Sequence, residues 1–137
     1  MALTHVVDTS VLTRLGQASV RRVVEPLLNA GQIGRVDISD LEIGFSARNA
    51  SEWDRLMTAL RVFTSLQVDP SHFTRAGQVQ RVLASLGHRG RKIPDLLIAA
   101  VAEDAGCIVL HYDQDFDLIS EATGQPCQWV VPRGSID

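Results

Sequence analysis

The chain has 137 residues, 45% of them hydrophobic, which is enough for one domain with one core. Its formal net charge of −3 argues against a general nucleic-acid binder, so any nucleic-acid site must be a local patch. The sequence also argues against a disulfide framework, a signal peptide and a membrane span, so we expect a cytoplasmic protein with no membrane contact.

The first half of the chain predicts strands that alternate with helices. In chain order we expect a strand at residues 4–8, a short helix capped by Thr9 and Ser10, a helix at 20–30, a strand within 33–38, a helix from 39 to about 48, a helix at 52–65 and a short strand at 67–68. Ser39 is a strong N-cap candidate, which places Asp40 and Glu42 in the first turn of its helix.

The second half is organised around one apolar helix. We expect a helix at 72–86, a basic loop at 87–92, a buried helix from 94, a strand at 107–110, a short helix from 116 that Gly124 ends, a strand at 128–131 and a tail at 132–137. Asp95 falls in the first turn of the buried helix, where the helix dipole favours an anion. Asp113 and Asp115 directly follow the next strand.

Alternating strands and helices predict the α/β class, with a mostly parallel central sheet flanked by helices on both faces. No repeat or linker divides the chain, so residues 1–137 are interpreted as a single domain. Parallel strands end at one edge of the sheet, where α/β proteins place their ligands. The topology therefore predicts that acids far apart in the chain meet in one crevice: Asp8, Glu42, Asp95, Asp113 and Asp115.

Carboxylates gathered in this way need a positive charge. Two of them about 4 Å apart repel by roughly 4 kcal/mol at an effective dielectric constant near 20. Lys92 is the only lysine, and oxygen ligands without histidine or cysteine select Mg²⁺ or Mn²⁺ over zinc. A divalent ion held in this way, with water positions left open, suits the hydrolysis of phosphate esters.

Each acid also has a purely structural interpretation. Asp8 can cap the next helix, and Glu42 can complete a capping box with Ser39. Asp113 and Asp115 can be ordinary turn residues. Their common position at strand ends and helix starts favours a functional site for the group as a whole.

The loop before Asp95 carries three cations, Arg89, Arg91 and Lys92. The loop can simply be solvated, or it can hold an RNA backbone close to the metal. We favour RNA binding because these cations directly precede one of the acids.

Four segments carry a resemblance to a known family: residues 6–10 (VVDTS), 39–42 (SDLE), 93–100 (IPDLLIAA) and 110–116 (LHYDQDF). Together, and in this order, they make the chain resemble PIN-domain ribonucleases, and specifically the VapC-type toxins of bacterial toxin–antitoxin pairs. The resemblance implies a PIN-like fold and a Mg²⁺- or Mn²⁺-dependent endoribonuclease. It also implies inhibition by a cognate VapB-type antitoxin and a homodimer.

The resemblance further assigns roles to individual residues. The family's four acids fall on Asp8, Glu42, Asp95 and Asp113, of which all but Glu42 are expected to hold the metal. Glu42 is expected to position or deprotonate the attacking water. Asp115 and Ser10 are possible additional members of the site.

Two other classes of function compete with this interpretation. A phosphatase of the haloacid-dehalogenase type needs a second acid two residues after the first, where this chain has Ser10. A receiver domain needs a lysine beyond its last strand, whereas Lys92 precedes the buried helix. Both of these belong to one class, other Mg²⁺-dependent folds, and a non-catalytic PIN-fold interaction module is the second class. The sequence leaves open the RNA target, the number of metal ions and the choice between Mg²⁺ and Mn²⁺.

Overall fold

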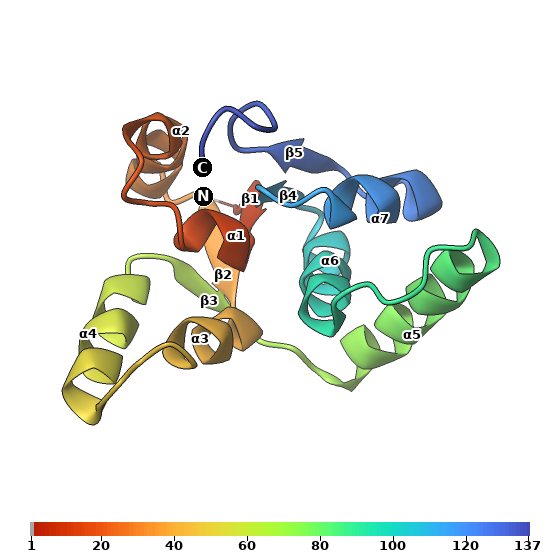
Figure 1. The fold of residues 1–137 in the computed structure, drawn as a ribbon, viewed down its shortest axis with the longest axis horizontal. Coiled ribbons are helices and arrows are strands. Elements are labelled where there is room, and N and C mark those ends of the chain that lie inside the picture. Colours follow the sequence, from red (N-terminus) through yellow and green to blue (C-terminus); the bar gives the residue numbers. More distant parts are fainter. Residues whose placement is uncertain (1) are drawn as a thin grey trace.

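The computed structural model describes residues 2–137, and within them the strands form one five-stranded sheet. The strands are β1 (His5–Val7), β2 (Ile33–Val36), β3 (Thr64–Leu66), β4 (Ile108–His111) and β5 (Cys127–Trp129). Their order is β3-β2-β1-β4-β5, and every neighbouring pair is parallel. The α/β class with a parallel central sheet is therefore confirmed (Figure 1).

Helices cover both faces of this sheet. Consecutive strand residues point to opposite faces, so Val6 packs with α5, α6 and α7, and Val7 packs with α1, α2 and α4. Among the described residues, no helix is long and apolar enough to cross a membrane. The helices are α1 (Thr9–Leu12), α2 (Ala18–Asn29), α3 (Asp37–Gly44), α4 (Ala50–Leu60), α5 (Pro70–Ser85), α6 (Ile93–Ala105) and α7 (Asp115–Thr123).

Helix α6 is the most deeply buried helix, as its apolar sequence predicts. Residues 95–102 are all buried, between α5, α7 and the sheet. Pro94 lies in its first turn, where a missing backbone N–H costs nothing, and Gly106 ends it with a φ of +67°. This packing fixes the start of α6, and with it Asp95, at one end of the sheet.

The predicted N-cap at Ser39 is wrong. Helix α3 begins two residues earlier, at Asp37, and Ser39 is fully buried inside its first turn. The hydroxyl of Ser39 lies 2.8 Å from that of Thr9, so a tertiary contact replaces the expected cap. Asp40 forms an ion pair with Arg35 instead of acting only on the helix dipole. The proposed capping box with Glu42 is therefore absent.

Helix α3 also ends earlier than predicted, at Gly44 rather than near residue 48. A Cβ atom on Gly44 would lie 2.7 Å from Nε1 of Trp53, so any other residue here would have to displace the Trp53 ring of α4. The next strand is β3 at Thr64–Leu66 rather than 67–68. Burial of Phe63 ends the preceding helix before residue 65 and directs the chain into pairing with β2.

Candidate active site

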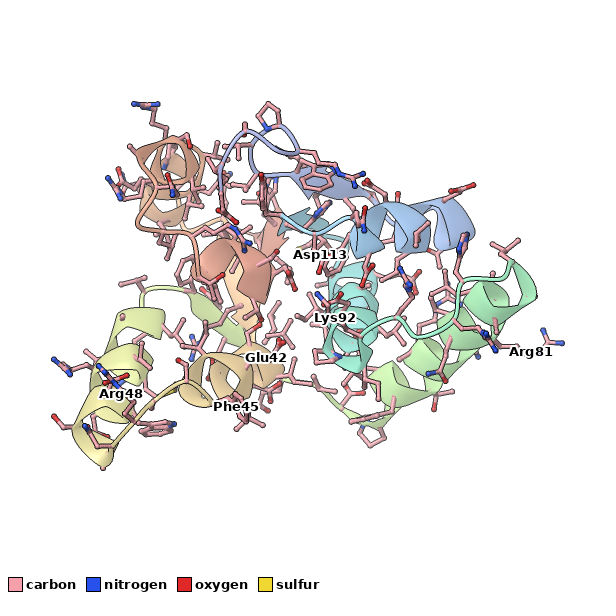
Figure 2. All side chains as sticks on the ribbon, viewed as in Figure 1. Glu42, Phe45, Arg48, Arg81, Lys92 and Asp113 are labelled. Carbon is pink, nitrogen blue, oxygen red and sulfur yellow. The ribbon has the colours of Figure 1, made fainter. Side chains whose placement is uncertain are left out.

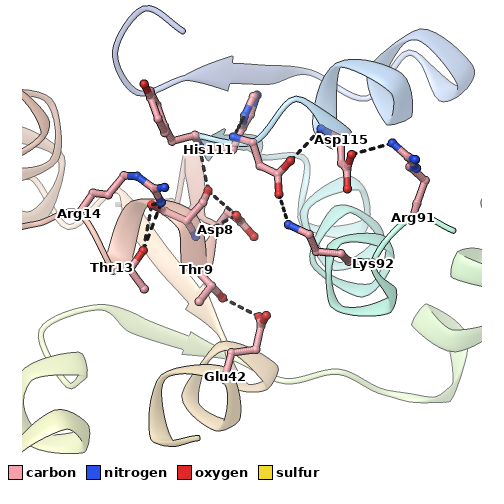
Figure 3. Close-up of polar contacts among 12 residues, drawn as sticks. Asp8, Thr9, Thr13, Arg14, Glu42, Arg91, Lys92, His111 and Asp115 are labelled. Carbon is pink, nitrogen blue, oxygen red and sulfur yellow. Dashed lines mark hydrogen bonds and ion pairs between the residues drawn. The ribbon is translucent and has the colours of Figure 1, made fainter. Parts of the chain in front are cut away.

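The predicted acids meet where the strand order reverses. β1 and β4 are neighbours in the sheet but not in sequence, and the backbone N–H of Asp8 donates to the carbonyl of Leu110 at 2.9 Å. Asp8 follows β1, Asp113 follows β4, and the start of α6 and the middle of α3 bring Asp95 and Glu42 to the same edge. These four acids line one pocket of about 240 Å³, and Figure 3 shows two of them, Asp8 and Glu42. Its placement at a topological switch point is typical of ligand sites in parallel sheets.

Asp8 is held by Ser10, which lies two residues further along the chain in α1. Its Oδ2 accepts hydrogen bonds from the backbone N–H of Ser10 at 3.0 Å and from the Ser10 hydroxyl at 2.5 Å. Its Oδ1 is buried and has no hydrogen-bond partner in the described part of the chain. Burial, with repulsion from Glu42 and Asp113, raises the pKa of Asp8 to about 6 despite the Ser10 contacts.

Asp95, in the first turn of α6, resembles Asp8 in the burial of its carboxylate. Its side chain is buried, and Oδ2 has no hydrogen-bond partner among residues 2–137. Burial and repulsion from Asp8 and Asp113 raise the pKa of Asp95 to about 8, which the nearby Lys92 offsets only in part. The dipole at the start of α6 therefore does not compensate the charge of the Asp95 carboxylate. A further cation would stabilise this carboxylate.

Asp113 and Asp115 are neutralised by the basic loop. Nζ of Lys92 lies 2.6 Å from Oδ2 of Asp113, and Nη1 of Arg91 lies 2.8 Å from Oδ1 of Asp115. Burial opposes ionisation of Asp113, but the Lys92 hydrogen bond and the backbone N–H of Asp115 lower the pKa of Asp113 below its usual range. Two of the three cations predicted to bind RNA thus contact the acids, and Arg89 is exposed.

Glu42 is oriented by Thr9, a residue that the sequence did not single out beyond a capping role. The Thr9 hydroxyl donates to Oε1 of Glu42 at 2.6 Å and also lies against the Ser39 hydroxyl (Figure 3). Because Thr9 directly follows Asp8, the same turn of chain positions two of the acids. Its place next to the first acid is the only sequence signal that could have found it.

The acids fit a divalent metal. Asp95, Asp113 and Asp115 each offer a carboxylate oxygen within 4.8 Å of the others. Asp8 lies outside this tightest group but lines the same pocket, and its buried Oδ1 has no partner. Orphaned carboxylate oxygens on two neighbouring acids are what a cation site leaves when protein donors are absent. An all-oxygen set of this kind suits a hard divalent ion.

His111 orders the loop that carries Asp113. Its ring is buried between Phe116 and Trp129, with centroids 5.0 Å from each, and Nδ1 accepts from the Asp113 N–H at 3.2 Å. Burial lowers the pKa of His111 to about 4, so the ring is neutral at pH 7. We infer that His111 supports the position of Asp113. Three further residues that line the pocket carried no sequence signal: Thr13, Arg14 and Tyr112.

Comparison with known proteins agrees with this geometry. A family model described as PIN domain matches residues 5–122. The chain is 58% identical over 137 residues to Ribonuclease VapC51 of Mycobacterium tuberculosis, with 100% of both chains covered. It is 45% identical over 133 residues to Ribonuclease VapC18 of the same organism, covering 95% of this chain and 97% of that one. The solved structure of DNA-bound VapBC from Salmonella typhimurium shares the fold, with a TM-score of 0.74 at 17% identity over 94% of this chain and 99% of that one.

Proposed function

The chain belongs to the PIN-domain family and, within it, to the VapC ribonucleases, and from this premise we propose that it hydrolyses RNA phosphodiester bonds as the toxin of a toxin–antitoxin pair. One observation carries the proposal: Asp8 and Asp95 each keep a buried carboxylate oxygen without a partner in a pocket shared with Glu42 and Asp113. A site built only for stability would not concentrate uncompensated charge in this way. The cytoplasmic location expected from the sequence stays a prediction.

We propose Mg²⁺ as the ion, with Mn²⁺ as its closest substitute. Asp8, Asp95 and Asp113 would hold it, and Asp115 would join them through the oxygen that lies near Asp95 and Asp113. When bound, the ion would polarise the phosphoryl oxygens and lower the pKa of an attacking water.

The chain's own residues would position the reaction. Thr9 holds Oε1 of Glu42, which leaves Oε2 to orient the attacking water and accept its proton. Ser10 fixes Oδ2 of Asp8, so that the second oxygen, Oδ1, keeps a constant position. Lys92 holds Asp113 at the opposite side of the pocket. Glu42, Asp8 and Asp113 therefore each have a second residue that sets the orientation of the carboxylate.

We also propose two protein partners, a VapB-type antitoxin and a second copy of this chain. Apolar side chains on the surface support protein contact, since Leu41, Phe45 and Phe73 are between 59% and 92% exposed. Leu41 and Phe73 line a groove of about 440 Å³ between α3 and α5. Phe45 directly follows α3 and lies below this helix in Figure 2, whereas Glu42 lies above it. Mass measurement in solution, with and without the antitoxin, tests both partners.

The function is tested by incubating purified protein with total RNA in Mg²⁺, in EDTA, and with the variant D8N. We expect discrete fragments from the wild type in Mg²⁺ and none in the other two samples. D54N, which removes an exposed acid on α4, is the matched control and should cleave like the wild type. Fragments that persist in EDTA or in D8N would overturn the proposal. A folded wild type that cleaves no RNA would favour the non-catalytic module.

A further inference from the structure

Two cations line the acidic pocket, and they have different partners. Figure 3 shows Arg14 and Lys92 on opposite sides of Asp8. Lys92 contacts Asp113, which belongs to the candidate metal site. Arg14 instead contacts Asp137, which lies 123 residues away in the sequence and does not line the pocket. The partner of Arg14 therefore comes from outside the catalytic group.

The guanidinium of Arg14 is fixed by contacts that do not involve Asp137. Nη1 donates to the carbonyl of Ser10 at 2.8 Å, and the guanidinium carbon lies 4.9 Å from the centre of the Tyr112 ring. Ser10 is also the residue that holds Asp8, so Arg14 has a defined position beside the first acid. Removal of Asp137 would leave both of these contacts in place.

Asp137 occupies the opposite edge of the guanidinium. Nε lies 3.0 Å and Nη2 lies 2.8 Å from Oδ2 of Asp137, and Nε is 3.2 Å from Oδ1. Two adjacent N–H groups that face one oxyanion are the arrangement by which arginine binds carboxylate or phosphate. The side chains are 28% and 48% exposed, and an ion pair this accessible to water adds little stability and exchanges readily.

Tyr112 holds the tail, residues 132–137, in this position. Its hydroxyl donates to the carbonyl of Ile136 at 2.8 Å and accepts from the N–H of Gly134 at 3.0 Å and that of Ile136 at 3.3 Å. These contacts hold residues 134–136 at the edge of the pocket. The carboxylate that follows them is therefore placed on Arg14 by the fold and not by chance contact of a free end.

We propose that the Nε–Nη2 edge of Arg14 is a binding site for an RNA phosphate beside the candidate active site, and that Asp137 occupies it in the free protein. The inference rests on the proposed function, because it takes RNA as the substrate. Bound RNA replaces the carboxylate with a phosphate, while Ser10 and Tyr112 keep Arg14 in place. Asp137 is thus a competitor of RNA, and its removal strengthens RNA binding.

The test measures binding without cleavage. Fluorescence anisotropy of a labelled single-stranded RNA of about 20 nucleotides is recorded in EDTA for wild type, R14M, R14Q, D137N and R14M/D137N. R81M is the control for a lost arginine, because Arg81 is exposed on α5 and lies far from Asp113 in Figure 2. D54N is the control for a lost exposed acid, and thermal melts confirm that every variant is folded.

We expect R14M and R14Q to weaken RNA binding about fivefold or more and to reduce the slope of log affinity against log salt by about 0.7, the value for one phosphate contact on a single strand. R81M and D54N should stay within about twofold of the wild type. D137N should bind RNA about two- to fivefold more tightly than D54N does. In the R14M background, D137N should change nothing, because the site for which it competes is gone.

Three results would overturn the inference. Equal RNA binding by R14M and R81M, with a wild type that binds or cleaves RNA, rejects it and leaves the proposed function intact. Weaker binding by D137N makes Asp137 a support for Arg14 and not a competitor of RNA. A wild type that neither binds nor cleaves any RNA rejects both proposals together.

Discussion

Asp8 and Asp95 face one pocket from the end of a strand and the start of a helix, and each leaves a buried carboxylate oxygen without a protein partner. They are 87 positions apart in the sequence, and only the parallel sheet brings them together. After burial, Asp8 is the largest single cause of the raised pKa of Asp95. This uncompensated pair leads to two predictions for the metal-free protein.

Neutralising Asp8 should stabilise the metal-free protein. In D8N at pH 8 we expect the free energy of unfolding in EDTA to rise by about 1–3 kcal/mol, since the raised pKa makes ionisation of Asp8 costly in the folded state. Asparagine also preserves the N-cap of α1, whereas D8A removes that cap and forfeits about 1 kcal/mol of the gain. Urea unfolding measures the difference. A D8N protein less stable than the wild type would contradict the repulsion between these acids.

Asp95 should make the stability of the metal-free protein fall as pH rises. Its folded pKa of about 8 lies above the usual aspartate value of 3.8, so its contribution to stability is fully present below pH 3.8 and is lost as pH rises through about 8. The D95N protein has no ionisable group at this position, so its stability does not fall for this reason as pH rises. The melting temperature of D95N in EDTA should therefore exceed that of the wild type by a margin that grows between about pH 5 and pH 8.5. A margin that shrinks over this range would show that the Asp95 pKa is not raised.

Lys92 should compete with the metal for Asp113. Removing this cation in K92M frees Oδ2 of Asp113 and reduces repulsion of an incoming divalent ion, so Mn²⁺ should bind about three- to tenfold more tightly. R89M loses the same charge from the same loop at an exposed position and serves as the control. Calorimetric titration gives both affinities. Equal Mn²⁺ affinity in K92M and R89M would mean that the Lys92 contact does not oppose metal binding.

Thr9 should act on the reaction through Glu42. T9V keeps the shape of the side chain but removes the hydrogen bond to Oε1, so we expect kcat to fall about 10- to 100-fold with KM nearly unchanged. T9S retains a hydroxyl and should recover most of the rate. If T9V and T9S cleave RNA equally fast, Thr9 does not orient Glu42 for catalysis.

The local sequence pattern and the parallel topology were sufficient to predict that the acids meet in one pocket. Contacts between residues far apart in the sequence could not be predicted in this way. Asp8, Asp95 and Asp113 were found because strand ends and helix starts of a parallel sheet share one edge. The role of Thr9 depends on a contact across 33 residues, which no periodic pattern encodes. Ser39 was misplaced because its N-cap preference is weaker than the burial that turns it toward Thr9.

The pairing of Arg14 with Asp137 is also a long-range contact, and for this reason the sequence did not predict it. The two residues lie near opposite ends of the chain, and the tail reaches the pocket only through its hydrogen bonds to Tyr112. The cations of the basic loop were noticed, but their contacts with Asp113 and Asp115 depend on how the loop folds back before α6. Charge in a sequence shows which groups are available and not which of them will pair.

Calorimetric titration of Mn²⁺ into wild type, D95N and D54N tests most directly whether these acids bind a divalent metal. At pH 7 we expect one or more binding events in the wild type with release of protons, because the pKa of Asp95 is about 8 and the metal binds its ionised form. Repeating the titration in two buffers of different ionisation enthalpy counts those protons. D54N should bind like the wild type and D95N at least about tenfold more weakly. Identical titrations for wild type and D95N, or no binding by either, would contradict the account.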